Sequence, residues 1–123
     1  MVVVEDNEIN AEITQTVLEM VGIYSELACN GQEAVDKFVN SEVGYYDAIL
    51  MDIRMPVMDG LEATKCIRTS GKENSRTIPI IAMTANAFDE DMKKSIDSGM
   101  NGHLSKPIDV NKLYQVLKEI MPS

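Results

Sequence analysis

The sequence predicts a single α/β domain in which helices cover both faces of a parallel β-sheet. Short apolar runs alternate along the chain with longer amphipathic stretches, which is typical of successive β-α-β units. Three of these runs are almost continuously apolar, as expected of central strands that are buried on both faces. A length of 123 residues supports one hydrophobic core, so we expect one domain over residues 1–123.

Five strands are expected, because five short runs end at turn or polar residues. Buried strands are expected at residues 2–5, 48–52 and 78–83, and a short strand at residues 102–104. The run at residues 24–28 alternates between polar and apolar side chains, which predicts a strand at an edge of the sheet.

Between the strands, apolar residues recur at helical spacing and predict five helices. The first covers residues 9–21 and is closed by Gly22, whereas the last covers residues 110–120 and is capped by Asp109. The other helices are expected after Asn30-Gly31, at residues 61–68 and, only weakly buried, at residues 89–98.

The composition excludes several classes of partner. The net charge of −9 at pH 7 argues against direct binding to nucleic acid, because such binding depends on Lys and Arg side chains that neutralise phosphates. No apolar run approaches the roughly 18 residues of a membrane span, so no direct membrane contact is expected. Cys29 and Cys66 form no CxxC pair and have no His at metal-ligand spacing, so we expect reduced, half-buried thiols.

Polar residues follow the ends of four predicted strands. They are Glu5, Asp6, Asp52, Thr84 and Lys106. In an open parallel sheet the carboxyl ends of the strands share one edge, and ligands bind at that edge. We therefore expect three carboxylates, a hydroxyl and an ammonium group to meet at one place.

This set of side chains suits a divalent cation and a phosphoryl group. Carboxylates packed closely in apolar surroundings repel one another, and Mg²⁺ would offset that repulsion while it binds phosphoryl oxygens. Lys106 would add a positive charge near the same oxygens, and Thr84 a neutral hydroxyl donor. Asp52 stands alone at its strand end, whereas Glu5 and Asp6 are paired, as metal ligands would be. We therefore interpret Asp52 as the nucleophile of an in-line phosphoryl transfer.

Each of these residues also has a simpler explanation. Glu5 and Asp6 would suit the amino terminus of a helix, where acidic residues are favoured. Asp52 could cap a turn, and Lys106 could be a solvated surface residue. Their joint occurrence at matching strand ends favours a functional site.

Four short motifs occur in order across essentially the whole chain. They are Glu5-Asp6-Asn7, residues 51–60 (MDIRMPVMDG), Met83-Thr84-Ala85-Asn86 and Lys106-Pro107. Together they resemble the receiver (response regulator) domain of two-component signalling, and the sequences of the motifs are most similar to those of receivers in hybrid sensor histidine kinases. The resemblance implies a flavodoxin-like, doubly wound (βα)5 fold whose five-stranded parallel sheet has the strand order 2-1-3-4-5.

The resemblance implies a metal site and a phosphoacceptor. Glu5, Asp6 and Asp52 would hold Mg²⁺ together with the backbone carbonyl of Arg54. Asp52 would accept a phosphoryl group from phosphohistidine on a histidine kinase or a histidine phosphotransfer domain. No conventional enzyme activity is implied beyond self-catalysed phosphorylation and dephosphorylation of Asp52, although the parent chain would be a hybrid histidine kinase.

The resemblance also implies a switch. Thr84 and Lys106 would bind the phosphoryl oxygens, and Thr84 would act with His103, which stands where the family usually has Tyr or Phe. The switch would alter the face formed by the fourth helix, the fifth strand and the fifth helix, which binds a downstream protein. Arg54 and Asn86 flank the phosphoryl site and are expected to set how long the phosphoryl group lasts.

The amino-terminal residues bear on location. Met1-Val2-Val3-Val4 is too short for a secretory signal and lacks its basic flank, so a cytoplasmic location is expected. A receiver in the cytoplasmic part of a membrane-bound sensor kinase would have the same location. The abrupt start suggests a domain trimmed from a longer chain.

Three alternatives share parts of this pattern. A metal-dependent phosphohydrolase with an aspartyl nucleophile would carry a second acid two residues later, where this chain has Arg54. A flavin-binding domain would need a Gly-rich or hydroxyl-rich phosphate loop after the first strand, where Glu5-Asp6-Asn7-Glu8 would repel the phosphate. A receiver-like module that binds a partner without phosphorylation would keep the fold, but the complete set of acids, hydroxyl and lysine counts against it.

Overall fold

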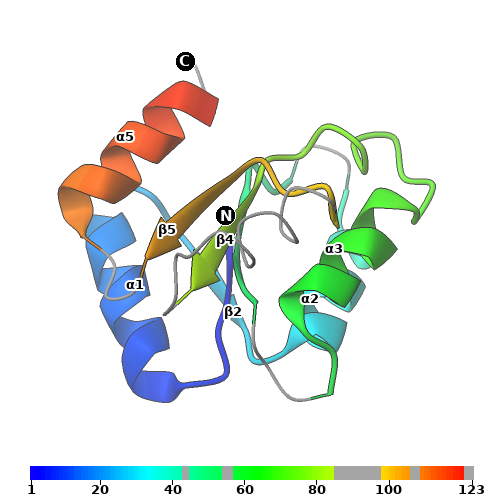
Figure 1. The fold of residues 1–123 in the computed structure, drawn as a ribbon, viewed down its shortest axis with the longest axis horizontal. Helices are drawn as coiled ribbons and strands as arrows, with labels where there is room; N and C mark the ends of the chain where they lie inside the picture. The colour runs from blue at the N-terminus through cyan, green and yellow to red at the C-terminus, as the bar shows by residue number, and fades with distance from the viewer. Residues whose placement is uncertain (43–44, 54–56, 85–97, 106–108, 121–123) are drawn as a thin grey trace.

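The computed structural model describes residues 1–42, 45–53, 57–84, 98–105 and 109–120 of the protein, and in those ranges strands alternate with helices (Figure 1). The elements are β1 (Val2–Val4), α1 (Glu8–Met20), β2 (Glu26–Ala28), α2 (Gly31–Asn40), β3 (Ile49–Asp52), α3 (Gly60–Arg68), β4 (Ile80–Thr84), β5 (Gly102–Ser105) and α5 (Val110–Ile120). Residues 89–97 of the expected fourth helix lie outside the described residues. Among the described helices, none combines the length and the apolar composition that a membrane span requires.

All five strands pair in parallel, in the order β2-β1-β3-β4-β5. This order confirms the predicted flavodoxin-like fold and places β2, the strand of alternating polarity, at an edge. Val4 pairs with both Ala28 and Met51, and Asp52 pairs with Met83. The carboxyl ends of the strands therefore lie along one edge of the sheet.

Two layers of helices enclose the sheet, one on each face (Figure 1). On one face, strand side chains pack with α2 and α3 through residues such as Phe38 and Ile67, in what we term the α2–α3 core. On the other face they pack with α1 and α5 through residues such as Leu18 and Leu113, the α1–α5 core. Because successive strand residues point to opposite faces, each central strand contributes to both cores, which explains its continuously apolar sequence.

Each of these helices begins with a side-chain cap at the carboxyl edge of the sheet. The capping residues are Asn7, Asn30, Asp59 and Asp109, as expected for the last of them. Their side-chain oxygens accept hydrogen bonds from backbone N–H groups two or three residues later, which have no partner inside the helix. The caps fix where each helix starts and so direct four helix amino termini toward one edge.

Two strands begin later than the sequence predicts. β4 begins at Ile80 rather than at residue 78, because Pro79 has no N–H to donate to a neighbouring strand. β2 begins at Glu26 rather than at residue 24, because its partner strand starts at Val2, which already pairs with Glu26.

The two cysteines are free thiols with different environments. Cys66 is partly buried in α3, as expected. Cys29 is exposed, so the expectation of a half-buried thiol is wrong there. It follows the last residue of the edge strand β2.

Candidate functional site

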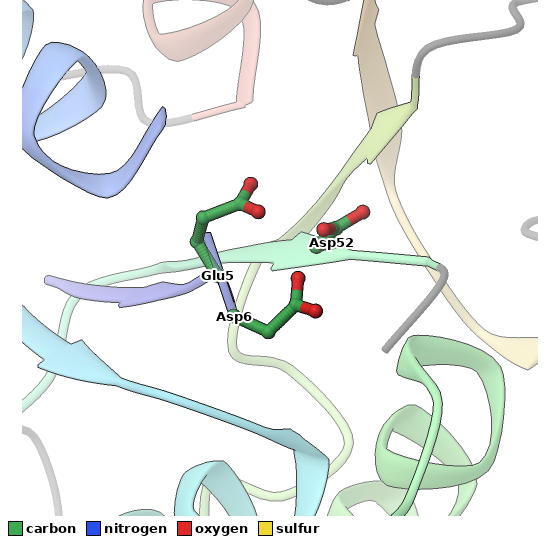
Figure 2. Close-up of side chains that lie close together, drawn as sticks. All are labelled: Glu5, Asp6 and Asp52. Carbon is green, nitrogen blue, oxygen red and sulfur yellow. The ribbon is translucent and has the colours of Figure 1, made fainter. Parts of the chain in front are cut away.

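Three carboxylates converge at the carboxyl edge of the sheet (Figure 2). Glu5 and Asp6 follow β1, and Asp52 is the last residue of β3. Because Val4 pairs with Met51, the next residues of the two strands are brought side by side. One carboxylate oxygen of each acid lies within 4.8 Å of those of the other two, a spacing that suits a single bound metal ion. The structure thus brings together the three acids that the sequence predicts as metal ligands.

The three acids differ in their exposure. Glu5 and Asp52 are only 2% and 5% exposed, whereas Asp6 is exposed to solvent. Two ionised carboxylates about 5 Å apart repel by about 3 kcal/mol at an effective dielectric of about 20, so a cation between them is favourable. A donor set made only of oxygens is the kind that Mg²⁺ and other hard cations prefer.

Local hydrogen bonds fix the turn between β1 and α1, which carries two of the acids. The N–H of Glu5 donates to the carbonyl of Ala28 at 3.0 Å, and Oε1 of Glu5 accepts from the N–H of Asn7 at 3.2 Å. Asn7 in turn caps α1 by accepting from the N–H groups of Ile9 and Asn10. The amino terminus of α1 therefore starts beside the acids, and its positive dipole end favours their charge.

A glycine keeps the backbone beside Asp52 in place. The N–H of Gly60 donates to the carbonyl of Ile53 at 2.9 Å and closes the loop between β3 and α3. A Cβ atom at Gly60 would collide with the carbonyl oxygen of Asp52 and lie 2.9 Å from Cγ of Met51. Sequence reasoning treats Asp59-Gly60 only as a turn and misses this contact. The available signal is a glycine in the first turn of a helix, where glycine is otherwise unfavourable.

The remaining predicted site residues are described only in part. Thr84 ends β4, and its backbone pairs with Ser105 at the same edge of the sheet. His103 lies within β5, opposite Ala82, and is partly exposed. The expected positions that lie outside the described residues are Arg54, Asn86 and Lys106. Their roles, and the switch role of Thr84 and His103, stay predictions.

Comparison with known proteins shows which family has this fold and this site. Residues 1–118 match the response regulator receiver domain, and the chain belongs to that family. It is 47% identical over 122 residues to the osmosensing histidine protein kinase SLN1 of Saccharomyces cerevisiae, covering 97% of this chain and 10% of that protein. It is 44% identical over 124 residues to the hybrid signal transduction histidine kinase G of Dictyostelium discoideum, covering 99% of this chain and 4% of that protein. The chain thus spans a tenth or less of the length of these relatives.

Solved structures show the same likeness. One is the receiver domain of a sensor histidine kinase from Pseudomonas aeruginosa, with a magnesium ion coordinated in its active site cleft. It is 39% identical, with a TM-score of 0.87 over 99% of this chain and 96% of that one. A co-crystal of the Saccharomyces cerevisiae histidine phosphotransfer protein Ypd1 with the receiver domain of Ssk1 contains a chain that is 36% identical. Its TM-score is 0.83 over 96% of this chain and 85% of that one. These matches confirm the receiver fold and the resemblance to hybrid histidine kinases.

Proposed function

We propose that Asp52 is the phosphoacceptor of this receiver domain and that it serves a two-component phosphorelay. The observation that carries the proposal is the group of three carboxylates within 4.8 Å at the carboxyl edge. Two of them are almost fully buried, which is costly for like charges unless a cation is bound. Asp52 is the best nucleophile because β3 is the central strand, with β1 and β4 on either side.

The reaction would be an in-line transfer between two side chains. A carboxylate oxygen of Asp52 would bond to phosphorus while the bond from phosphorus to the imidazole nitrogen of phosphohistidine breaks. The electron pair of the broken bond would stay with the imidazole, and the product would be an aspartyl phosphate. The chain contributes position, because Gly60 and the pairing of Asp52 with Met83 hold the nucleophile in place.

Glu5, Asp6 and Asp52 are the described residues that would hold Mg²⁺, and we propose the backbone carbonyl of Arg54 as a further ligand. Bound there, the ion would neutralise charge on the carboxylates and on the transferred oxygens. The magnesium ion in the cleft of the Pseudomonas aeruginosa receiver domain supports this assignment.

The proposed phosphoryl donor is phosphohistidine on a histidine kinase or a histidine phosphotransfer domain. The support is that the relatives are histidine kinases and that the Ssk1 receiver domain forms a complex with Ypd1. We propose that the downstream protein binds the face formed by β5, α5 and the helix expected between β4 and β5. On this face Tyr114 is 56% exposed and His103 is partly exposed. We propose that the whole protein is a hybrid kinase and that it holds this receiver in the cytoplasm.

Intact mass spectrometry after incubation with acetyl phosphate and Mg²⁺ tests the assignment of Asp52. The wild type should gain one phosphoryl group, and Asp52→Asn should gain none, because an amide does not replace the carboxylate nucleophile. Asp47→Asn is the matched control, since Asp47 is an exposed aspartate just before β3, and it should be labelled like the wild type. Labelling of Asp52→Asn would contradict the assignment. No labelling of the wild type would favour a receiver that binds its partner without phosphorylation.

A further inference from the structure

A cavity with aromatic walls lies at the edge of the sheet opposite the three clustered carboxylates. It has a volume of about 340 Å³ and is found at the amino ends of β1, β2 and β3. This volume falls within the roughly 300–1,000 Å³ that is usual for small-molecule sites. Three tyrosines and two acids are among the residues that line it, and we term it the tyrosine cavity. They are Tyr24, Tyr45, Tyr46, Glu26 and Asp47.

The aromatic rings give the tyrosine cavity one fixed wall and two accessible ones. Tyr46 is only 7% exposed and is held in the α2–α3 core. The ring of Tyr45 meets it at 78°, nearly edge to face. Tyr24 and Tyr45 are 77% and 61% exposed, so folding leaves most of their surface in solvent. Because the face of an aromatic ring carries negative partial charge, these rings are suited to attract a cation.

The charges at the tyrosine cavity also favour a cation. Of the described residues that line it, both with a charged side chain are acidic, Glu26 and Asp47. Lys37 pairs with Glu26 at 3.9 Å, but both side chains are partly exposed, and such pairs contribute little. The amino group of Met1 donates to the carbonyl of Tyr24 at 3.4 Å, and burial lowers its pKa although the two acids raise it. An ammonium group is thus attracted here but loses its proton more readily than in water.

The hydrogen-bonding groups of the tyrosine cavity are already partly used. The hydroxyls of Tyr45 and Tyr46 both hydrogen-bond to the carboxylate of Glu26. A primary ammonium group has three N–H donors that need acceptors, and it can lose its charge by losing a proton. A quaternary ammonium group has no N–H and keeps its charge at any pH. It needs only ring faces and negative charge, which this cavity supplies.

We infer that the tyrosine cavity binds a small quaternary ammonium compound of the choline type. The faces of Tyr24 and Tyr45 contact its methyl groups, and the charges of Glu26 and Asp47 attract its nitrogen. The compound carries no anionic group, because a phosphate beside the nitrogen would be repelled by the same acids. A free compound therefore binds better than the headgroup of a choline phospholipid. The cavity lies at the opposite edge of the sheet from Asp52, so the inference does not rest on the proposed function.

An NMR titration of the 123-residue chain with choline tests the inference. The backbone amide signals of residues 22–26 and 45–47 should shift and then saturate. The neutral analogue of choline, in which a carbon atom replaces the nitrogen, should bind about tenfold more weakly or worse, because it has the same shape without the charge. Phosphocholine should also bind more weakly than choline because of its phosphate.

Variants of exposed residues locate the binding without disturbing the core. Tyr24→Leu and Asp47→Asn should each weaken choline binding about fivefold, because each removes one attraction for the cation. Tyr114→Leu is the matched control, since Tyr114 is an exposed tyrosine of α5 that does not line the cavity, and it should bind choline like the wild type. Thermal unfolding should show that all three variants are folded.

Several results would overturn the inference. They are the lack of a saturable shift in the wild type, equal affinity for choline and its neutral analogue, and unchanged affinity in both cavity variants. Phosphocholine binding as tightly as choline would overturn the assignment of a ligand without an anionic group. Each of these results would leave Asp52 as the proposed phosphoacceptor, because none of them involves the carboxyl edge.

Discussion

Gly60 lies so close to the carbonyl group of Asp52 that a side-chain Cβ at this position would collide with it. Glycine in a helix costs roughly 1 kcal/mol relative to alanine, and Gly60 is the first residue of α3. The close approach explains why that cost is accepted, since any larger residue would separate α3 from β3. One end of a helix is thereby in direct contact with the backbone of the proposed nucleophile.

Gly60→Ala should lower the free energy of unfolding by about 1–3 kcal/mol and slow labelling by acetyl phosphate, because the added methyl group has to displace Asp52 or Met51. Urea unfolding and the rate of mass gain measure the two effects. Gly22→Ala is the control: φ of Gly22 is 80°, but nothing lies within 4 Å of its added Cβ. It should reduce stability without changing the labelling rate of the folded protein. Wild-type values for Gly60→Ala would show that the loop relaxes without affecting the site.

The sequence predicts the three acids but not the contact of Gly60. Glu5, Asp6 and Asp52 can be found because they follow apolar strands, and the carboxyl ends of parallel strands share an edge. That contact arises when the β3–α3 loop closes against α2 and β3. A glycine in the first turn of a helix is a local signal for the Gly60 contact, but no local pattern contains the closure itself.

At the scale of elements, Arg68 joins the carboxyl end of α3 to the starts of β4 and β5. Its guanidinium donates to the carbonyls of Gly99, Ser75 and Ile78 and to Oδ1 of Asn101, at 2.7–3.1 Å. Burial lowers the pKa of Arg68, and these oxygens replace the water that it loses. The helix is therefore held at both ends, by Gly60 at the site and by Arg68 away from it.

A second structural feature is the tyrosine cavity at the amino ends of β1, β2 and β3, opposite the acids of the carboxyl edge. The rings of Tyr45 and Tyr46 meet nearly edge to face, with centroids 4.8 Å apart. Burial, and then the charge of Glu26, raise the pKa of Tyr46 to about 12. Folding therefore favours the neutral form of this tyrosine.

Stability at alkaline pH should depend on Tyr46. Because its folded-state pKa lies above the ordinary value of 10.0, its contribution is complete below pH 10 and is lost as pH rises through about 12. As pH rises over this range, the denaturant midpoint of Tyr46→Phe should fall less steeply than that of the wild type. Tyr114→Phe, on the exposed side of α5, should fall like the wild type. An unchanged slope in Tyr46→Phe would show that another group controls the alkaline transition.

Element boundaries were predictable where a local signal marks them. α5 begins and ends where expected, because Asp109 caps it and regular apolar spacing continues to Ile120. β2 and β4 begin two residues late, because the start of a strand depends on where its partner starts and on which residues can donate to it. These are tertiary constraints that a run of apolar residues does not encode.

For the molecule as a whole, the acids at one edge make stability depend on cations. Mg²⁺ at about a hundredfold excess over its Kd would stabilise the domain by about 2.7 kcal/mol, which raises the thermal midpoint by roughly ten degrees. Asp6→Ala should remove most of this gain, because Asp6 offers one of the three clustered carboxylates, and Asp47→Ala should remove none. Thermal unfolding of each protein with and without Mg²⁺, at constant ionic strength, measures this stabilisation. A midpoint of the wild type that does not respond to Mg²⁺ would contradict the cation site.

The α2–α3 core and the α1–α5 core share no residue, since the sheet lies between them. Substitutions on α1 or α5 and substitutions on α2 or α3 lie on opposite faces of the sheet, so their effects on stability should add. Glu5, Asp6 and Asp52 belong to neither core. Natural selection can therefore vary α1 and α5 without repacking α2 and α3, while the acids keep their alignment. Lineages of such a domain can acquire new partners on one face and retain the same chemistry at the edge.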